Sequence, residues 1–130
     1  MTTEQGARIT DLASKELGLK LLYLFGSQAT GNVGPLSDYD FAVYFDGIPK
    51  QEILDHKIKL QLDLCSILET NAVDVVVLNN VTNPVLYYRA IAEGKLIYEV
   101  EPYRLLVEPK IVNAYIDYTM LMRQHGLTKI

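Results

Sequence analysis

The stretch that decides the fold reads Tyr23-Leu-Phe-Gly-Ser-Gln-Ala-Thr-Gly-Asn-Val-Gly-Pro-Leu-Ser-Asp-Tyr-Asp-Phe41. An apolar run ends at a small-residue corner, a turn-rich loop follows, and a second apolar run opens with Asp38 and Asp40. Successive side chains of a strand point to opposite faces, so we expect both carboxylates to share one face. Adjacent carboxylates resist joint ionisation unless a cation neutralises them. Carboxylate oxygens suit Mg²⁺, which also takes phosphate and water ligands.

The corner formed by Gly26 and Ser27 predicts a second kind of ligand contact. Gly26 lets backbone amides approach a ligand closely, and Ser27 supplies a hydroxyl and an amide at the start of an expected helical turn, where phosphates bind. Each feature alone is common, because a Gly-Ser corner is an ordinary turn and an Asp-x-Asp pair is often only a turn and a cap. Their combination predicts a phosphate-binding loop beside a metal site.

Length and composition narrow the class of protein. The 130 residues predict one domain over 1–130, with a core at about 20–98 and a C-terminal helix at 102–124. A net charge of -4 argues against strong nucleic-acid binding, although a small contact stays open. The polar N-terminus predicts no secretory signal, and no apolar run reaches the roughly 20 residues that span a membrane. The single cysteine, Cys65, cannot form an internal disulfide and fits a reducing cytoplasm.

Hydrophobic periodicity predicts alternating helices and strands. The expected helices cover residues 4–17, 50–69, 83–92 and 102–124, and the expected strands cover residues 20–25, 39–45, 72–78 and 96–99. Pro109 should kink the last helix or split it into two pieces, and His56 should lie at the surface. This order predicts an α/β fold with helices packed on a small mixed β-sheet.

A third carboxylate interrupts the apolar run Val73-Asp-Val-Val-Val-Leu78. A buried, unpaired carboxylate is costly, so two placements remain open for Asp74. It lies solvated at an exposed end of the strand, or it lies beside Asp38 and Asp40 on a neighbouring strand. In the second placement Asp74 would complete a cation site for attack at phosphorus and accept the proton of the attacking hydroxyl.

Two segments together resemble the DNA polymerase β-like nucleotidyltransferases. Leu24-Phe-Gly-Ser-Gln-Ala-Thr-Gly31 and Ser37-Asp-Tyr-Asp-Phe41 match their signature of Gly-Ser, ten residues, then Asp-x-Asp. The later segments, Val73-Asp-Val-Val-Val-Leu78 and Glu93-Gly-Lys-Leu-Ile-Tyr98, look most like the minimal nucleotidyltransferases, or MNT domains. The resemblance implies a small mixed sheet flanked by helices, and a reaction that uses Mg²⁺ and a nucleoside triphosphate, usually ATP.

The resemblance also implies roles for particular residues. The implied site residues are Gly26, Ser27 and Ser37 for nucleotide binding, Asp38 and Asp40 for the cations, and Asp74 as the third carboxylate, which also serves the acceptor hydroxyl. Gln28 stands where many relatives carry arginine, so a phosphate contact from that side chain is weaker or absent.

The sequence predicts the molecule that accepts the nucleotide less directly than it predicts the site. Many stand-alone MNT proteins of this size are antitoxins paired with a HEPN ribonuclease toxin, and members of that group transfer AMP from ATP to a tyrosine of the toxin. Only about 30 residues follow the sheet, which leaves little room to enclose a second substrate, so a partner protein that brings its own hydroxyl is expected. Two alternatives stay open: transfer to a small molecule such as an aminoglycoside or to an RNA end, and a non-enzymatic protein that masks the toxin by binding.

Overall fold

The computed structural model describes residues 1–26, 29 and 38–126. Its elements, in chain order, are α1 (Thr3–Lys15), β1 (Leu19–Phe25), β2 (Tyr39–Phe45), the 3-10 helix η1 (Lys50–Glu52), α3 (Ile53–Leu68), β3 (Val73–Val77), α4 (Pro84–Glu93), β4 (Lys95–Glu99) and α5 (Tyr103–Gln124). The strands form a sheet in the order β3-β2-β1-β4. β1 is antiparallel to β2 and β4, whereas β2 and β3 are parallel. The expected α/β fold with a small mixed sheet is confirmed.

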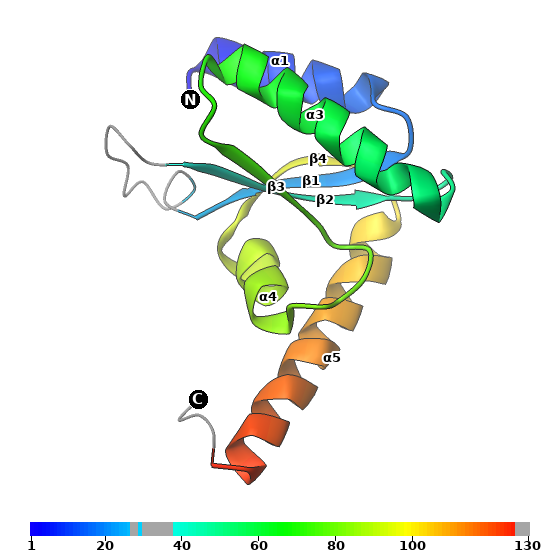
Figure 1. Ribbon diagram of the computed structural model, residues 1–130, viewed down its shortest axis with the longest axis vertical. Coiled ribbons are helices and arrows are strands. Elements are labelled where there is room, and N and C mark those ends of the chain that lie inside the picture. Colours follow the sequence, from blue (N-terminus) through cyan, green and yellow to red (C-terminus); the bar gives the residue numbers. More distant parts are fainter. Residues whose placement is uncertain (27–28, 30–37, 127–130) are drawn as a thin grey trace.

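Helices cover both faces of this sheet. Figure 1 shows α1 and α3 together on one face and α4 and α5 on the other. Leu22 of β1 packs into the core beneath α1 and α3, and its neighbour Leu21 packs into the core beneath α4 and α5. Both side chains are fully buried. The leucine-rich run is therefore the centre of the sheet, because a strand covered on both faces needs apolar residues at both alternating positions.

Two predicted helix ends are wrong. The first helix ends at Lys15 rather than at residue 17, and Leu17, expected on its apolar face, is 68% exposed. Glu16 leaves helical backbone with φ -76° and ψ 124°, and the chain turns at Gly18, with φ +78°, into β1. The helix predicted over 50–69 starts as the short 3-10 turn η1 and becomes α-helical at Ile53. The positions of these ends depend on how the chain must turn to join the sheet, which local periodicity does not report.

Pro109 lies inside α5, which continues as one helix rather than two pieces. Proline lacks the N–H that would reach the carbonyl four residues earlier, that of Leu105. Leu105 is 78% exposed, so water can hydrogen-bond on that side of the helix. Within the described ranges, we find no helix with the length and apolar content that a membrane crossing requires.

Candidate active site

Asp40 and Asp74 are neighbours on adjacent strands. β2 and β3 run parallel, and their register pairs Asp40 with Asp74. Tyr39 and Val73, the residues before them, pack into the core beneath α1 and α3, so both carboxylates belong to the opposite face, on the side of α4. Asp38, directly before β2, is exposed and lies close enough for its charge to act on Asp40. The three predicted carboxylates therefore meet at one end of the sheet, and Asp74 is both exposed and beside Asp40.

This clustering changes the acidity of Asp40. Partial burial raises the pKa of the Asp40 carboxyl above its ordinary value, and the negative charges of Asp74 and then Asp38 raise it further. Joint ionisation is thus unfavourable in the protein as it stands. A cation or a proton placed between these carboxylates would relieve the repulsion.

Gly26 brings the end of β1 against the same carboxylate. The β1–β2 register places Phe25 opposite Asp40, and Gly26 then turns with φ +76°, a conformation that favours glycine. A Cβ at this position would lie 2.5 Å from Oδ2 of Asp40. The absence of a side chain at Gly26 therefore allows the corner and the carboxylate to lie in contact.

The remaining predicted nucleotide-binding residues, Ser27 and Ser37, lie outside the described residues, as does Gln28, so their roles stay predictions. Ala29 is described and is 8% exposed. Its N–H donates a 3.1 Å hydrogen bond to the carbonyl oxygen of Gly26. A turn therefore starts at the glycine corner, where the sequence predicts one.

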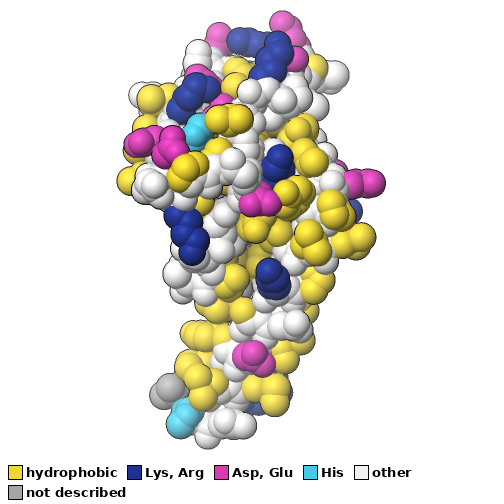
Figure 2. Space-filling model, turned by 90° about the vertical axis from the view of Figure 1, so that its right-hand side faces the viewer, with side chains coloured by type: hydrophobic (Ala, Val, Ile, Leu, Met, Phe, Trp, Pro, Cys, Tyr) yellow, Lys and Arg dark blue, Asp and Glu magenta, His cyan; other side chains and the backbone are white. Residues whose placement is uncertain are grey.

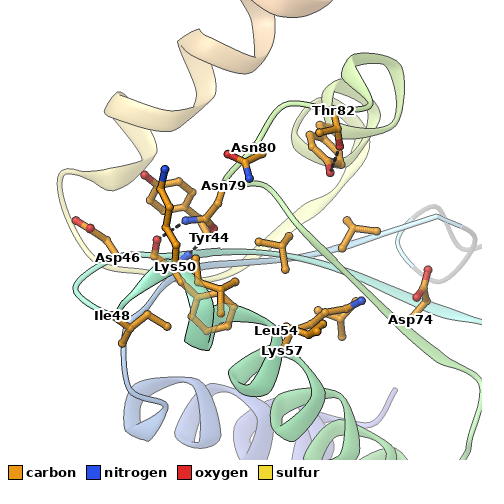
Figure 3. Close-up of a pocket in the computed structure, with 16 residues that line it drawn as sticks. Tyr44, Asp46, Ile48, Lys50, Leu54, Lys57, Asp74, Asn79, Asn80 and Thr82 are labelled. Atoms are coloured by element: carbon orange, nitrogen blue, oxygen red, sulfur yellow. Dashed lines mark hydrogen bonds between the residues drawn. The ribbon is translucent and has the colours of Figure 1, made fainter.

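A cleft of about 860 Å³ follows the outer edge of β3 (Figure 3). Leu54 and Lys57 of α3 line one wall, and Asn80 and Thr82, from the segment after β3, line the other. Asp74 lines the same cleft at its far end. Of the three carboxylates, Asp74 is the one that lines the cleft.

The sequence analysis missed this cleft, and only the pair Asn79-Asn80 after an apolar strand could have suggested it. Asn79 shapes its wall with two hydrogen bonds to the backbone of Phe45 at the end of β2. The Phe45 N–H donates to Oδ1 at 3.0 Å, and Nδ2 of Asn79 donates to the Phe45 carbonyl at 2.6 Å. This amide ties the β3–α4 connection to β2 and holds the cleft wall in place.

Comparison with known proteins identifies the family. A family model described as polymerase beta, nucleotidyltransferase, matches residues 7–103. The chain belongs to this nucleotidyltransferase family. Protein adenylyltransferase MntA of Aphanizomenon flos-aquae is 33% identical over 87 residues, which cover 62% of this chain and 57% of MntA. The chain thus spans little more than half the length of this curated relative.

Solved structures share the fold of this chain. A toxin–antitoxin complex with AMP-PNP contains a chain with 23% identity and a TM-score of 0.71, over 95% of this chain and 94% of that chain. A complex of tri-AMPylated Shewanella oneidensis HEPN toxin with MNT antitoxin gives 24% identity and a TM-score of 0.70, with the same coverage of 95% and 94%. The family model and these shared folds together confirm the predicted polymerase β-like fold.

The carboxylates of this family member fit a hard cation by their chemistry rather than as a complete cage. In the part of the chain that the structure describes, no three His, Cys, Asp or Glu side chains are arranged to hold a metal ion by themselves. Mg²⁺ needs only one or two carboxylates when phosphates and water complete its shell. Burial and then the charges of Asp74 and Asp38 raise the pKa of Asp40, and a cation beside these carboxylates would relieve their repulsion. The donor set therefore fits Mg²⁺ that arrives with a triphosphate.

His56 belongs to a different cluster, between α1 and α3. Its Nδ1 lies 3.4 Å from Oε1 of Glu16, whose side chain is only 2% exposed. Nζ of Lys59 donates to the other oxygen of Glu16 at 2.9 Å. His56 was predicted to lie at the surface, but it is half-buried, because it packs beside this carboxylate and the ring of Phe45.

Proposed function

We propose that this chain is a Mg²⁺-dependent nucleotidyltransferase that moves AMP from ATP to a tyrosine hydroxyl of a HEPN-type toxin, and so acts as its antitoxin. The observation that supports this most is the register of Asp40 with Asp74 beside the Gly26 corner. The 33% identical relative is a protein adenylyltransferase. Structures of the same fold come from toxin–antitoxin complexes, one with AMP-PNP and one with an AMPylated HEPN toxin.

Each site residue has a separate role in the proposed reaction. Gly26, Ser27 and Ser37 bind the nucleotide, and Asp38 and Asp40 bind Mg²⁺. Bound Mg²⁺ supplies charge neutralisation for the triphosphate and for the departing pyrophosphate. The acceptor oxygen attacks the α-phosphorus, the bond to pyrophosphate breaks, and the acceptor proton passes to Asp74. Because Asp74 is exposed, a hydroxyl carried by another molecule can reach it.

A partner protein is favoured as the source of that hydroxyl. α5 extends away from the sheet (Figure 1), and Figure 2 shows hydrophobic side chains along this projecting part. The large apolar side chains exposed on α5 are Leu105, Leu106, Ile116, Tyr118, Met120 and Leu121. Apolar and aromatic side chains of this kind are enriched in protein–protein interfaces. The chain thus offers apolar surface on α5 to which a partner protein can bind.

The test is AMP transfer to a HEPN-type protein encoded beside this gene, measured by intact mass after incubation with ATP and Mg²⁺. Wild type should add AMP to the partner. Asp38→Asn and Asp40→Asn should lower the rate by about 100-fold or more, since positioned charges supply such factors. Asp74→Asn should also lower it, and circular dichroism should show intact folds. Asp11→Asn, which changes an exposed carboxylate of α1, is the matched control and should keep the wild-type rate.

The same variants separate the alternatives. Undiminished AMP addition by Asp38→Asn would reject the assigned site. Transfer to an aminoglycoside or an RNA end, with no protein present, would reject the protein acceptor. The exposed face of α5 also suits silencing by binding alone. If Asp38→Asn protects cells from the toxin as well as wild type does, masking rather than chemistry is the mechanism.

A further inference from the structure

The parts of the candidate active site lie on three strands in a fixed order. The register pairs Phe25 of β1 with Asp40 of β2, and Asp40 with Asp74 of β3. In phosphoryl transfer the attacking and leaving oxygens lie roughly in line through the phosphorus. With the triphosphate tail at Gly26, directly after β1, pyrophosphate leaves on the side of β1. The acceptor hydroxyl therefore enters on the opposite side, that of β3.

The cleft of about 860 Å³ lies on this acceptor side. Asp74 of β3 and Lys57 of α3 are among the residues that line it. Its apolar lining includes Leu54, which is 60% exposed, and the half-buried side chains of Val76 and Val77. A tyrosine side chain combines an apolar ring with a polar hydroxyl. The cleft therefore offers apolar contacts for such a ring and polar groups for its hydroxyl.

α3 carries Lys57 close to the start of β3. Gln61, one turn later on the same side of α3, donates a 2.9 Å hydrogen bond from Nε2 to the carbonyl of Val73. Val73 directly precedes Asp74 in β3. Lys57 lies only about 6 Å before Gln61 along the helix axis. Figure 3 shows its side chain extending along the cleft toward Asp74.

The ammonium group of Lys57 is available to a substrate. Lys57 is half-buried, and among the described residues it forms no hydrogen bond or ion pair. The next lysine of α3, Lys59, is paired with the buried Glu16 at 2.9 Å. Asp46, the second acid that lines the cleft, already accepts a 2.6 Å hydrogen bond from the Tyr103 hydroxyl. A half-buried ammonium is costly to leave without an acceptor, and a substrate oxygen would supply one.

We propose that Lys57 is a catalytic residue that donates a hydrogen bond to the acceptor oxygen, opposite Asp74, and so favours a tyrosine as the acceptor. The inference rests on the proposed function and deepens it. Asp74 takes the phenol proton, the phenol oxygen bonds to the α-phosphorus, the bond to pyrophosphate breaks, and Lys57 keeps its protons. The ammonium stabilises the negative charge that develops on the phenol oxygen. A phenol, with a pKa of about 10, carries this charge more readily than a serine or threonine hydroxyl does.

The pKa of the bound phenol tests this without ATP or Mg²⁺. The probe is the HEPN-type partner with fluorotyrosine at its acceptor position, bound to this chain and titrated by fluorine NMR. Lys57→Met should raise the pKa of this phenol by about one unit, since it removes a nearby opposite charge. The carboxylates of Asp38, Asp40 and Asp74 stay in place, so the difference measures the effect of Lys57. Lys50→Met is the matched control and should leave this pKa unchanged, because Lys50 lies at the other end of the cleft (Figure 3).

The rate of AMP transfer at saturating partner supplies the second measurement. Lys57→Met should lower this rate about 100-fold, the effect of removing one donor to a developing negative charge, with an unchanged circular dichroism spectrum. Lys57→Arg, which keeps the charge, should retain more of the rate, and Lys50→Met should retain all of it. Fluorotyrosine in the partner, whose phenol is more acidic, should speed Lys57→Met more than wild type. A lysine with a merely structural role would leave this dependence on phenol acidity unchanged.

The role of Lys57 and the proposed function fail differently. If wild type adds AMP to the partner while Lys57→Met changes neither the transfer rate nor the pKa of the bound phenol, the role of Lys57 is wrong and the proposed function remains. A slower Lys57→Met with the wild-type dependence on phenol acidity would also overturn the catalytic role. If wild type adds no AMP to the partner, the proposed function is wrong, and the role of Lys57 with it.

Discussion

Tyr23 and Glu108 join the centre of the sheet to the last helix through one short hydrogen bond. Tyr23 Oη donates to Oε2 of Glu108 at 2.6 Å, and Nε of Arg104 donates to the same oxygen at 3.0 Å. Burial raises the pKa of the Tyr23 hydroxyl well above its ordinary value, and the bond to Glu108 raises it further. The phenol therefore stays neutral and keeps its proton for Glu108. This contact helps to set how α5, with its exposed apolar side chains, lies against β1.

Tyr23→Phe should lower the free energy of unfolding by about 1–2 kcal/mol, because it removes a buried hydrogen bond to a charged acceptor. Urea denaturation at neutral pH measures the change. Tyr118→Phe, which removes an exposed hydroxyl from α5, is the control and should stay within about 0.5 kcal/mol of wild type. Equal effects of the two changes would show that the bond to Glu108 does not stabilise the fold.

Gly26→Ala should impair both stability and AMP transfer, and Gly47→Ala should impair stability alone. Both glycines have positive φ, +76° and +81°, so alanine should cost about 1–2 kcal/mol at either position. Only at Gly26 would the new Cβ meet Oδ2 of Asp40, whereas nothing lies within 4 Å at Gly47. We expect Gly26→Ala to lose at least about tenfold in transfer rate, since small displacements at a reacting centre are costly. A rate for Gly47→Ala as low as that for Gly26→Ala would contradict a specific role of the corner.

Asp40→Asn should raise the thermal midpoint at neutral pH when divalent cations are absent. The pKa of Asp40 is raised in the folded protein, so the folded state binds this proton more tightly than the unfolded chain does. The stability that the proton contributes is therefore complete below the ordinary pKa of about 4 and is lost as the pH rises through the folded pKa. The advantage of asparagine should therefore be absent near pH 3 and should open as the pH increases. Thermal unfolding from pH 3 to 8 measures it, with Asp11→Asn as the exposed control. A gap that is largest at low pH would refute the assigned cause.

Glu16→Gln should lower the free energy of unfolding by about 2 kcal/mol, because its buried carboxylate accepts a charge-assisted hydrogen bond from Lys59. The same bond raises the pKa of Lys59. Asp11→Asn, which removes the exposed pair with Lys15, should cost no more than about 0.5 kcal/mol. Chemical denaturation compares the two, and AMP transfer should be unchanged in both. Equal, small losses would contradict a stabilising role for the buried carboxylate.

Several elements could be predicted from local patterns. The strand predicted over 39–45 matches β2, Tyr39–Phe45, because alternation and the turn-forming residues around it are local signals. Asp74 was expected in a strand, and it lies in β3. Helix ends were less predictable: Leu17 has apolar character and helical spacing, but it lies beyond the end of α1. Pro109 did not split α5, since the side of the helix that loses a hydrogen bond is exposed.

Two side-chain clusters that join distant segments, those of Glu16 and Tyr23, were not predictable. The sequence shows Glu16 as one charge among many, yet the packing of α1 against α3 buries it beside Lys59. Tyr23 reads as an ordinary core residue, yet α5 brings Glu108 to its hydroxyl. Each cluster depends on the packing of elements far apart in the chain, which periodicity within one element does not encode.

By itself the sequence determined that Asp38 and Asp40 open a strand after a glycine corner, because side-chain alternation and glycine conformation are local properties. It also showed that the chain carries the nucleotidyltransferase signature. Only the tertiary structure decided that Asp74 lies opposite Asp40 and that residues of β3 line a cleft. Parallel pairing joins strands that are distant in the chain, and its register and strand order result from the packing of the whole sheet between its helices.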